Sequence, residues 1–232
     1  MRVSHSNSAR RGVTLACASL GESWLDVAGL ILQHGTPSTF DGLPLIECDL
    51  VTLDIECPNP DDPIIATHAD PEWLAWMRSN FTDHRRVHEL GDARSYASRL
   101  FDYMGAGRNQ ISAVLETLRK DAHASYATIT TFEPLSDASY IPCVSLLDFW
   151  LRSGSLELVV YAHSIDFGKK GYGNLVQLAE LQSDVANQLS VPVGPLVMIV
   201  KSATIYQTEV SLMSEVITAV QRDQTGRTSE PR

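Results

Sequence analysis

The sequence predicts a single-domain α+β protein in which helices cover a mixed or antiparallel sheet. Long apolar and β-branched runs predict strands, other segments carry apolar residues at helical spacing, and turn residues separate the two kinds of segment. With 232 residues, 44% of them hydrophobic and 20% charged, the chain can bury one sizeable core. We expect flexible polar tails at 1–13 and 222–232 and one domain over 14–221.

Several segments have the apolar spacing of helices that bury one face. These expected helices cover 22–34, 70–81, 107–121 and 174–190. Gly35 can close the first of them, and Asp70 with Pro71 favours the N-cap and first position of the second. In the third, the clearest, one face carries Ile111, Val114, Leu115 and Leu118.

Strands are expected between these helices. The apolar and β-branched runs cover 43–58, 126–132, 143–151, 156–164 and 194–207. Residues 152–155 have the composition of a hairpin loop, and the proline- and aspartate-rich stretch 59–63 is typical of a turn.

The net charge and the spacing of the cysteines exclude some classes of protein. A net charge of −10 argues against a non-specific nucleic-acid surface, although a pocket for a small anion needs only a few local donors. The four cysteines have no paired spacing, and the apolar run 13–21 is short for a secretory signal, so we expect reduced thiols in a cytoplasmic protein. The sequence contains no apolar run long enough to cross a bilayer, and no membrane association is expected.

A series of short motifs runs from Tyr96 to Tyr206. They read NQISAVLETLRKD (109–121), FEP (132–134), IPCVSLLDF (141–149), YAHSIDFGKKGYGN (161–174) and SATIYQTE (202–209). In order and spacing they resemble the thymidylate synthase and pyrimidine hydroxymethylase superfamily, whereas the first 90 residues match only loosely. The resemblance implies the family's fold, with helices covering a mixed sheet, and its homodimer, in which the sheets pack back to back.

The resemblance also implies a reaction. In the family, a cysteine thiolate adds to C6 of a pyrimidine, and C5 then takes a one-carbon unit from 5,10-methylenetetrahydrofolate. Cys143 is placed for this attack, because a thiolate adds and leaves readily near neutral pH. By itself, a lone cysteine after a proline in an apolar run equally fits a buried structural thiol.

Further site residues follow from the same motifs. Asn174 would read the base, because an amide presents one donor and one acceptor, as uracil requires; it also fits a helix N-cap. Asp166 would line the base and folate site. Tyr206 would contact the sugar, although a strand tyrosine packed in a core is the alternative. The remaining expected substrate contacts are Ser164, His163 and Tyr96.

Of the expected site residues, Glu72 matches the resembled family least closely. It lies where the family has a glutamate that relays protons to the base carbonyl. A glutamate in the first turn of a helix also interacts favourably with the helix dipole, so both interpretations stand.

The sequence departs from the family at its phosphate-binding positions. His163 replaces the arginine before Ser164, and Ser125 and Tyr126 replace an arginine pair that the family donates across the dimer. Each lost charge-assisted contact contributes about 1.5–3 kcal/mol, so an altered or non-phosphorylated pyrimidine is a serious alternative substrate. Thr204 and Val144 replace two family histidines. Arg94, Arg99 and Lys169 are the cations that could compensate.

The product is a second open point. The chain ends soon after the Tyr206 strand and its following helix, without the family's long C-terminal extension, and the stretch 81–88 offers no counterpart of its shielding tryptophan. An open site lets water capture the methylene, so we expect hydroxymethylation rather than reductive methylation.

Other functions fit the sequence less well. A diverged, non-catalytic member that keeps a ligand pocket is the main alternative. No metal is expected, because His84, His88, Cys57 and His68 lack the close spacing of a zinc site. The glycines and lysines of 168–173 lack the spacing of a phosphate-binding P-loop, and His163 near Cys143 has no cysteine-protease signature around it.

Overall fold

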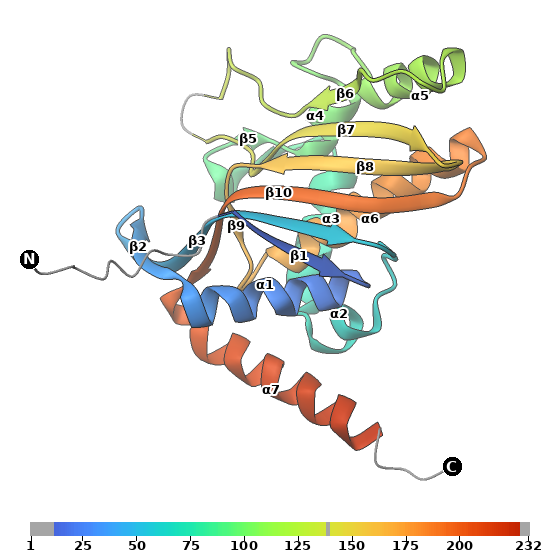
Figure 1. The fold of residues 1–232 in the computed structure, drawn as a ribbon. Coiled ribbons are helices and arrows are strands. Elements are labelled where there is room, and N and C mark those ends of the chain that lie inside the picture. The colour runs from blue at the N-terminus through green and yellow to red at the C-terminus, as the bar shows by residue number, and fades with distance from the viewer. Residues whose placement is uncertain (1–11, 138–139, 228–232) are drawn as a thin grey trace, which may run out of the picture.

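The computed structural model describes residues 12–137 and 140–227, so the outer parts of the two expected tails, 1–11 and 228–232, lie outside the described residues. One eight-stranded sheet forms the centre of the molecule (Figure 1). Its strands are β1 (Val13–Cys17), β2 (Thr36–Phe40), β3 (Leu43–Ile55), β6 (Ala127–Thr130), β7 (Val144–Arg152), β8 (Ser155–Ala162), β9 (Ile165–Asp166) and β10 (Val193–Tyr206). The main order is β1-β3-β10-β8-β7-β6, with β2 on β3 and β9 on β10.

The sheet is mixed, as the sequence predicted. The pairs β1–β3, β8–β10 and β9–β10 are parallel, and the other pairs are antiparallel. A separate two-stranded sheet joins β4 (Arg86–Val87) and β5 (Ala93–Arg94). The expected hairpin between β7 and β8 turns at Ser153 and Gly154, whose φ angles of 51° and 85° are those that a two-residue type I′ turn requires.

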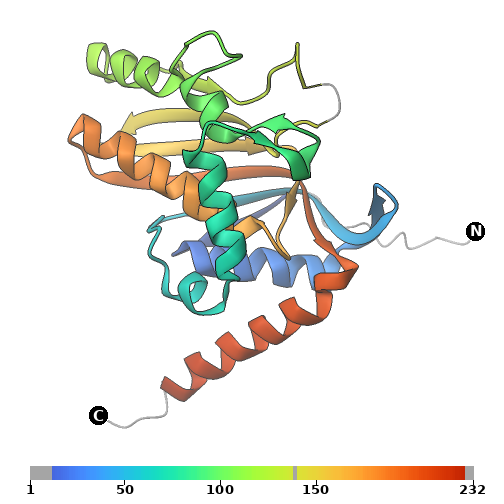
Figure 2. The same cartoon turned by 180° about the vertical axis from the view of Figure 1, so that it is seen from behind.

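The helices are α1 (Leu20–His34), α2 (Pro63–His68), α3 (Pro71–Thr82), α4 (Tyr96–Phe101), α5 (Gln110–Lys120), α6 (Gly171–Leu189) and α7 (Val210–Arg227), with short 3₁₀ turns at His88–Leu90 and Gln207–Glu209. Helices α1 and α6 pack on one face of the sheet, α3 packs on α6, and α7 packs on α1. Figure 2 shows α3 and α6 in front of the sheet, and Figure 1 looks onto the opposite face, where none of the described helices crosses β3, β10, β8 or β7.

Strand alternation explains this one-sided packing. In β8, Leu158 and Val160 are buried under the helices, whereas Val159 and Tyr161 point to the other face and stay partly exposed. The core also contains a hydrogen bond between residues that are far apart in the sequence. The Trp24 indole of α1 donates to the carbonyl of Phe167, at 2.9 Å. The four predicted helices and the five predicted strand regions are all present.

Several short elements were not predicted from the sequence, among them β1, β2, β4, β5, β9, α2 and α4. Strand β1 is only five residues long and is fixed by its parallel pairing with β3. Helix α2 begins inside the expected turn, because the Asp62 carboxylate caps it by accepting from the amides of Ile64 and Ile65. Helix α4 has only six residues. Helix α7 continues through Arg227, into the segment whose composition suggested a tail.

A glycine brings α3 close to α6. A Cβ atom at Gly173 would lie 3.0 Å from the Cβ of Met77, closer than packed side chains normally approach. The absence of a side chain at Gly173 therefore allows Met77, and with it Trp76, to form a wall of the cavity described next.

Candidate active site

A cavity of about 640 Å³ opens at the ends of β8, β9 and β10, in the size range of small-molecule sites. Its walls come from β2, β3, α3, α4, the residues before β7 and the start of α6. It brings together all but one of the predicted site residues, namely Tyr96, Cys143, His163, Ser164, Asp166, Asn174 and Tyr206.

Glu72 is the exception. It lies in the exposed first turn of α3, its amide donates to the Asp70 carboxylate at 2.8 Å, and it does not line the cavity. This position fits the helix-dipole interpretation, and we assign Glu72 no part in the reaction.

Cys143 lies directly before β7, beside an irregularity in the sheet. The pairing of β7 with β8 shifts by one residue between Val144 and Leu146, and such bulges reorient neighbouring side chains. The Cys143 carbonyl accepts from the amide of His163 at 3.0 Å, and the Tyr96 hydroxyl accepts from the amide of Val144 at 3.0 Å. These hydrogen bonds fix the backbone at Cys143 and Val144, while the Cys143 side chain stays partly exposed in the cavity.

Asn174 lies in the first turn of α6 and is buried. Its amide nitrogen donates to the Lys170 carbonyl at 3.2 Å, whereas its Oδ1 has no partner among the described residues. The N-cap of α6 is Lys170, so the N-cap role considered for Asn174 is wrong. A buried oxygen without a partner costs free energy, and a ligand that donates a proton to it removes that cost.

Asp166 stands at the end of β9 and accepts from the amide of Gly168 at 3.0 Å. Burial raises the pKa of its carboxyl from its usual value to about 6, against the opposing effects of this hydrogen bond and of Lys170. Near neutral pH the group therefore exists in both protonation states, which suits a residue that passes protons.

His163 does not restore the charge of the arginine that it replaces. Burial and the nearby Lys201 lower the pKa of its imidazole below the usual value, so the ring is neutral at pH 7. Its Nδ1 lies 3.4 Å from the Ser145 hydroxyl. Thr204 donates to the Ile165 carbonyl at 3.2 Å, and Val144 is buried in the core, so these replacements stabilise the fold.

Tyr206 ends β10 and lines the cavity with a partly exposed side chain. The core-packing alternative is therefore wrong for this tyrosine. Ser164 lines the same cavity.

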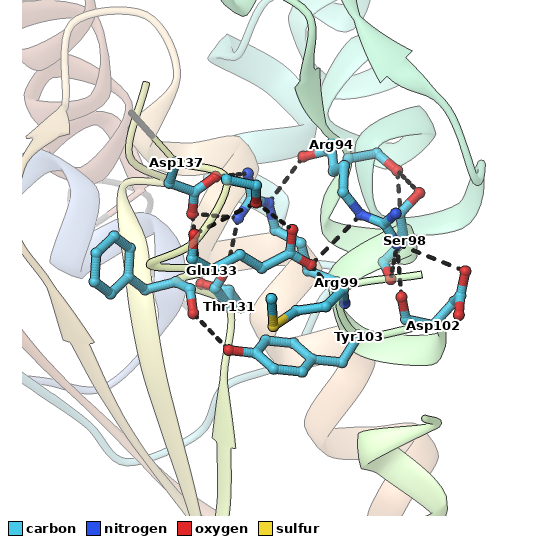
Figure 3. Close-up of polar contacts among 12 residues, drawn as sticks. Arg94, Ser98, Arg99, Asp102, Tyr103, Thr131, Glu133 and Asp137 are labelled. Atoms are coloured by element: carbon cyan, nitrogen blue, oxygen red, sulfur yellow. Dashed lines mark hydrogen bonds and ion pairs between the residues drawn. The ribbon is translucent and has the colours of Figure 1, made fainter. Parts of the chain in front are cut away.

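Arg94 and Arg99 line the cavity, but both already form ion pairs with acidic side chains. Arg99 makes a bidentate pair with Asp137, with both nitrogen–oxygen distances at 2.7 Å, and also donates to the Thr131 carbonyl at 2.7 Å (Figure 3). Arg94 lies 3.4 Å from the fully buried carboxylate of Glu133 and 3.6 Å from that of Asp102. Glu133 stands where the resembled family has asparagine, and it balances this arginine.

The remaining cation considered, Lys169, lies 4.7 Å from the Trp73 ring centre and does not line the cavity. Two other lysines do, Lys170 and Lys201. Neither was among the predicted site residues, because only the folded chain brings Lys170 near Cys143 and Lys201 near His163.

The Arg99–Asp137 pair predicts a large effect on stability. Arg99→Ala leaves Asp137, whose side chain is 5% exposed, buried without its partner. We expect a loss of about 3–5 kcal/mol in the free energy of unfolding, or roughly 10 °C in Tm, measured by chemical and thermal denaturation.

The exposed pair of Arg78 and Glu180 supplies the control, because Arg78→Ala should cost about 0–1 kcal/mol. Replacing both Arg99 and Asp137 by apolar residues should recover much of the stability, since no charge is left unpaired. Equal losses for Arg99→Ala and Arg78→Ala would contradict the assignment.

Among the described residues, no group of three or more histidine, cysteine, aspartate or glutamate side chains is arranged to hold a metal ion. Within the same residues, no helix is both long and apolar enough to span a membrane.

Comparisons with known proteins agree with the geometry. The family model for thymidylate synthase matches residues 65–228. A "Putative thymidylate synthase" of Methanosarcina acetivorans is 24% identical over 90% of this chain and 96% of its own length. A protein of the same name from Methanothermobacter marburgensis is 31% identical over 55% of this chain and 57% of its own length. The "Deoxyuridylate hydroxymethyltransferase" of Bacillus phage SP01 is 33% identical over 42% of this chain and 27% of its own length. The chain therefore belongs to the thymidylate synthase family, and is a diverged member of it.

Proposed function

We propose that the protein transfers a one-carbon unit to C5 of a pyrimidine nucleotide or a close relative, through a covalent adduct of Cys143 at C6. The observation that carries this proposal is one cavity that holds a partly exposed thiol, a buried amide oxygen with no partner among the described residues, and a carboxyl with a pKa of about 6. These are the nucleophile, the base-reading group and the proton-passing group that such a reaction needs.

The electron and proton transfers can be assigned to this chain's residues. The Cys143 thiolate forms the Sγ–C6 bond, and the C5=C6 electron pair moves onto C5, with charge delocalised to O4. After C5 has gained its substituent it loses its proton to a base, for which Asp166 through a water is the group present. The electron pair left at C5 then releases the transferred carbon from the folate nitrogen, which takes up a proton. Water adds to that carbon and loses a proton, the C5=C6 double bond reforms, and the electron pair of the Sγ–C6 bond returns to the sulfur.

5,10-Methylenetetrahydrofolate supplies the one-carbon unit when bound. The cavity fits such a co-substrate, because Trp76, Phe40 and Ile141 give apolar surface for a flat ring while Asp166 can accept from ring N–H groups.

Uracil fits the base position. The Asn174 Oδ1 without a partner can accept from N3–H, and the amide nitrogen can donate to O4. Tyr206, Ser164, His163 and Tyr96 are the remaining groups that we assign to the substrate.

Hydroxymethylation is favoured over methylation within this proposal. The similarity to the phage hydroxymethyltransferase supports it, as do the hydroxyl groups of Ser38, Thr39 and Ser202 in the cavity wall, where water can be held. Mass spectrometry of the product decides, and a methylated pyrimidine as the sole product would exclude hydroxymethylation.

We also propose a homodimer formed by the face of the sheet that the described helices leave free. Neighbouring strands carry apolar side chains there, with Val159 beside Val197 and Tyr161 between Ile199 and Leu146. Tyr161 is 38% exposed. Sedimentation equilibrium should give twice the monomer mass, and Tyr161→Glu should shift the protein to monomers; a native monomer would contradict the dimer.

We propose that the protein acts in a reducing compartment such as the cytoplasm. A thiolate nucleophile works only while Cys143 is reduced, and the four cysteines are all free.

The alternative is a non-catalytic member that binds a ligand in the same cavity. It is favoured by the neutral His163 and by the arginines already paired with carboxylates, which weaken the expected hold on a phosphate. Lys170 and Lys201 are the cavity cations outside these ion pairs among the described residues, and they are the basis for testing phosphorylated substrates.

The deciding experiment is tritium release from C5-labelled UMP, dUMP, CMP, dCMP and their nucleosides in the presence of methylenetetrahydrofolate. Release from a uracil compound above the protein-free rate would support the proposed reaction and identify the sugar and phosphate state. No release, together with calorimetric binding of one of these compounds, would favour the non-catalytic alternative.

A further inference from the structure

A second phenol lies beside the proposed nucleophile. The Tyr140 hydroxyl is 3.8 Å from the Cys143 Sγ, within hydrogen-bonding range for sulfur, and both side chains line the cavity. Only Ile141 and Pro142 separate the two residues, and the proline fixes φ between them. Tyr140 lies just before the motif of residues 141–149 that carries the resemblance.

The direction of this hydrogen bond depends on the state of the sulfur. A thiol and a phenol can each donate, but a thiolate only accepts, so the bond to ionised Cys143 must come from the Tyr140 hydroxyl. Burial and the nearby Cys143 raise the pKa of Tyr140 well above its usual value, so its proton stays in place at neutral pH. A hydrogen bond to the charged form lowers the pKa of the acceptor group.

The site needs such a donor. Burial raises the pKa of the Cys143 thiol, which would leave little thiolate near pH 7, whereas the hydrogen bond from Tyr140 and the charge of Lys170 lower it. Lys170 is held in place: its ammonium lies 5.3 Å from the ring centres of both Trp73 and Trp76, and its residue is the N-cap of α6.

Among the hydrogen bonds of the described residues, only the one with Tyr140 reaches the Cys143 sulfur. The other groups near the sulfur are Tyr96 of α4, His163 after β8, Asp166 of β9 and Tyr206 of β10. The Tyr96 hydroxyl accepts from the amide of Val144, and Asp166 opposes ionisation of the thiol. The Arg99 guanidinium, near Tyr96 and Tyr140, is bonded to Asp137.

We propose that Tyr140 is a further catalytic residue, whose hydroxyl donates a hydrogen bond to the Cys143 thiolate and, with the ammonium of Lys170, keeps the nucleophile ionised. The inference rests on the proposed role of Cys143 but is independent of the substrate and of the product. It assigns to Tyr140 and Lys170 the stabilisation of negative charge that a thiolate in a partly desolvated cavity requires.

The test is the pH dependence of alkylation of Cys143 by iodoacetamide, followed by peptide mass spectrometry on the intact, folded protein. Tyr140→Phe keeps the ring and removes the hydroxyl, and we expect the apparent pKa of Cys143 to rise by about half a unit to one unit, which is about three- to tenfold less thiolate near neutral pH. Lys170→Met should raise it as well, and Lys170→Arg should restore it. The midpoint of the pH profile is the readout, because the intrinsic reactivity of a thiolate also changes with its pKa.

Two controls are available in the same chain. Cys57 is exposed and outside the cavity, so its alkylation should be identical in all variants. Tyr126→Phe removes an exposed hydroxyl that does not line the cavity, and it should leave the Cys143 profile unchanged.

The outcomes separate this inference from the proposed reaction. A Tyr140→Phe profile that superimposes on the native one, with circular dichroism showing a native fold, would overturn the role of Tyr140, even if C5 tritium were released. A shifted profile supports it, even if none of the pyrimidines tested releases tritium.

Discussion

Replacing Cys143 by alanine is expected to abolish C5 tritium release from whichever pyrimidine the native protein accepts. Removing the nucleophile removes the bond at C6, and without that bond C5 does not become nucleophilic. We expect a fall of about 10⁴-fold or more in kcat, to the level of the protein-free reaction. The assay is tritium release under single-substrate conditions with methylenetetrahydrofolate in excess.

Binding should survive this change. Asn174, Asp166 and Tyr206 remain in the cavity, so calorimetry should give a Kd for the substrate within a few-fold of the native value. Cys57→Ala is the matched control, because this exposed cysteine lies outside the cavity and should leave the rate unchanged. Appreciable turnover by Cys143→Ala would show that the C6 adduct with this residue is not part of the reaction.

The sequence predicted the part of the site that is carried by local motifs. Cys143, Asp166 and Asn174 follow from the motifs that resemble the family, and they converge because the residues before β7, strand β9 and the start of α6 all line one cavity. The long helices and strands were predictable for the same reason, since each carries its own periodic apolar pattern.

The rest depends on tertiary contacts. Strand β1 and helix α4 are too short to show a period, and they are fixed by pairing with β3 and by the buried side chain of Arg99. Nothing local to Arg99 shows that Asp137 neutralises it, because the two residues meet only in the folded chain. Lys170 was visible as part of a glycine- and lysine-rich run, but its approach to Cys143 follows from the packing of α3 against α6.

Asn174→Asp is expected to change the base that the protein accepts. An ionised aspartate presents only acceptors, so its oxygen would face the O4 carbonyl of uracil and repel it. With cytosine, the 4-amino group and a protonated N3 are both donors, and they match the two carboxylate oxygens. We expect kcat/KM for the uracil substrate to fall about 10²- to 10⁴-fold, and the cytosine counterpart to become the preferred substrate.

The pH dependence of the substrate preference of Asn174→Asp shows whether the charge of the introduced carboxylate causes the change. Once protonated, the introduced carboxyl group again presents one donor and one acceptor, which also suits uracil, so the preference for cytosine should weaken as the pH falls. At high pH the proton shared by N3 and the carboxylate is lost, so the rate for cytosine should fall there as well. Asn187→Asp, an exposed change on the same helix, adds the same charge outside the cavity and should leave the substrate preference unaltered. If Asn174→Asp lowered the rates for uracil and cytosine by the same factor at every pH, the side chain would be supporting the shape of the cavity. The Oδ1 that has no partner among the described residues would then not be the group that reads the base.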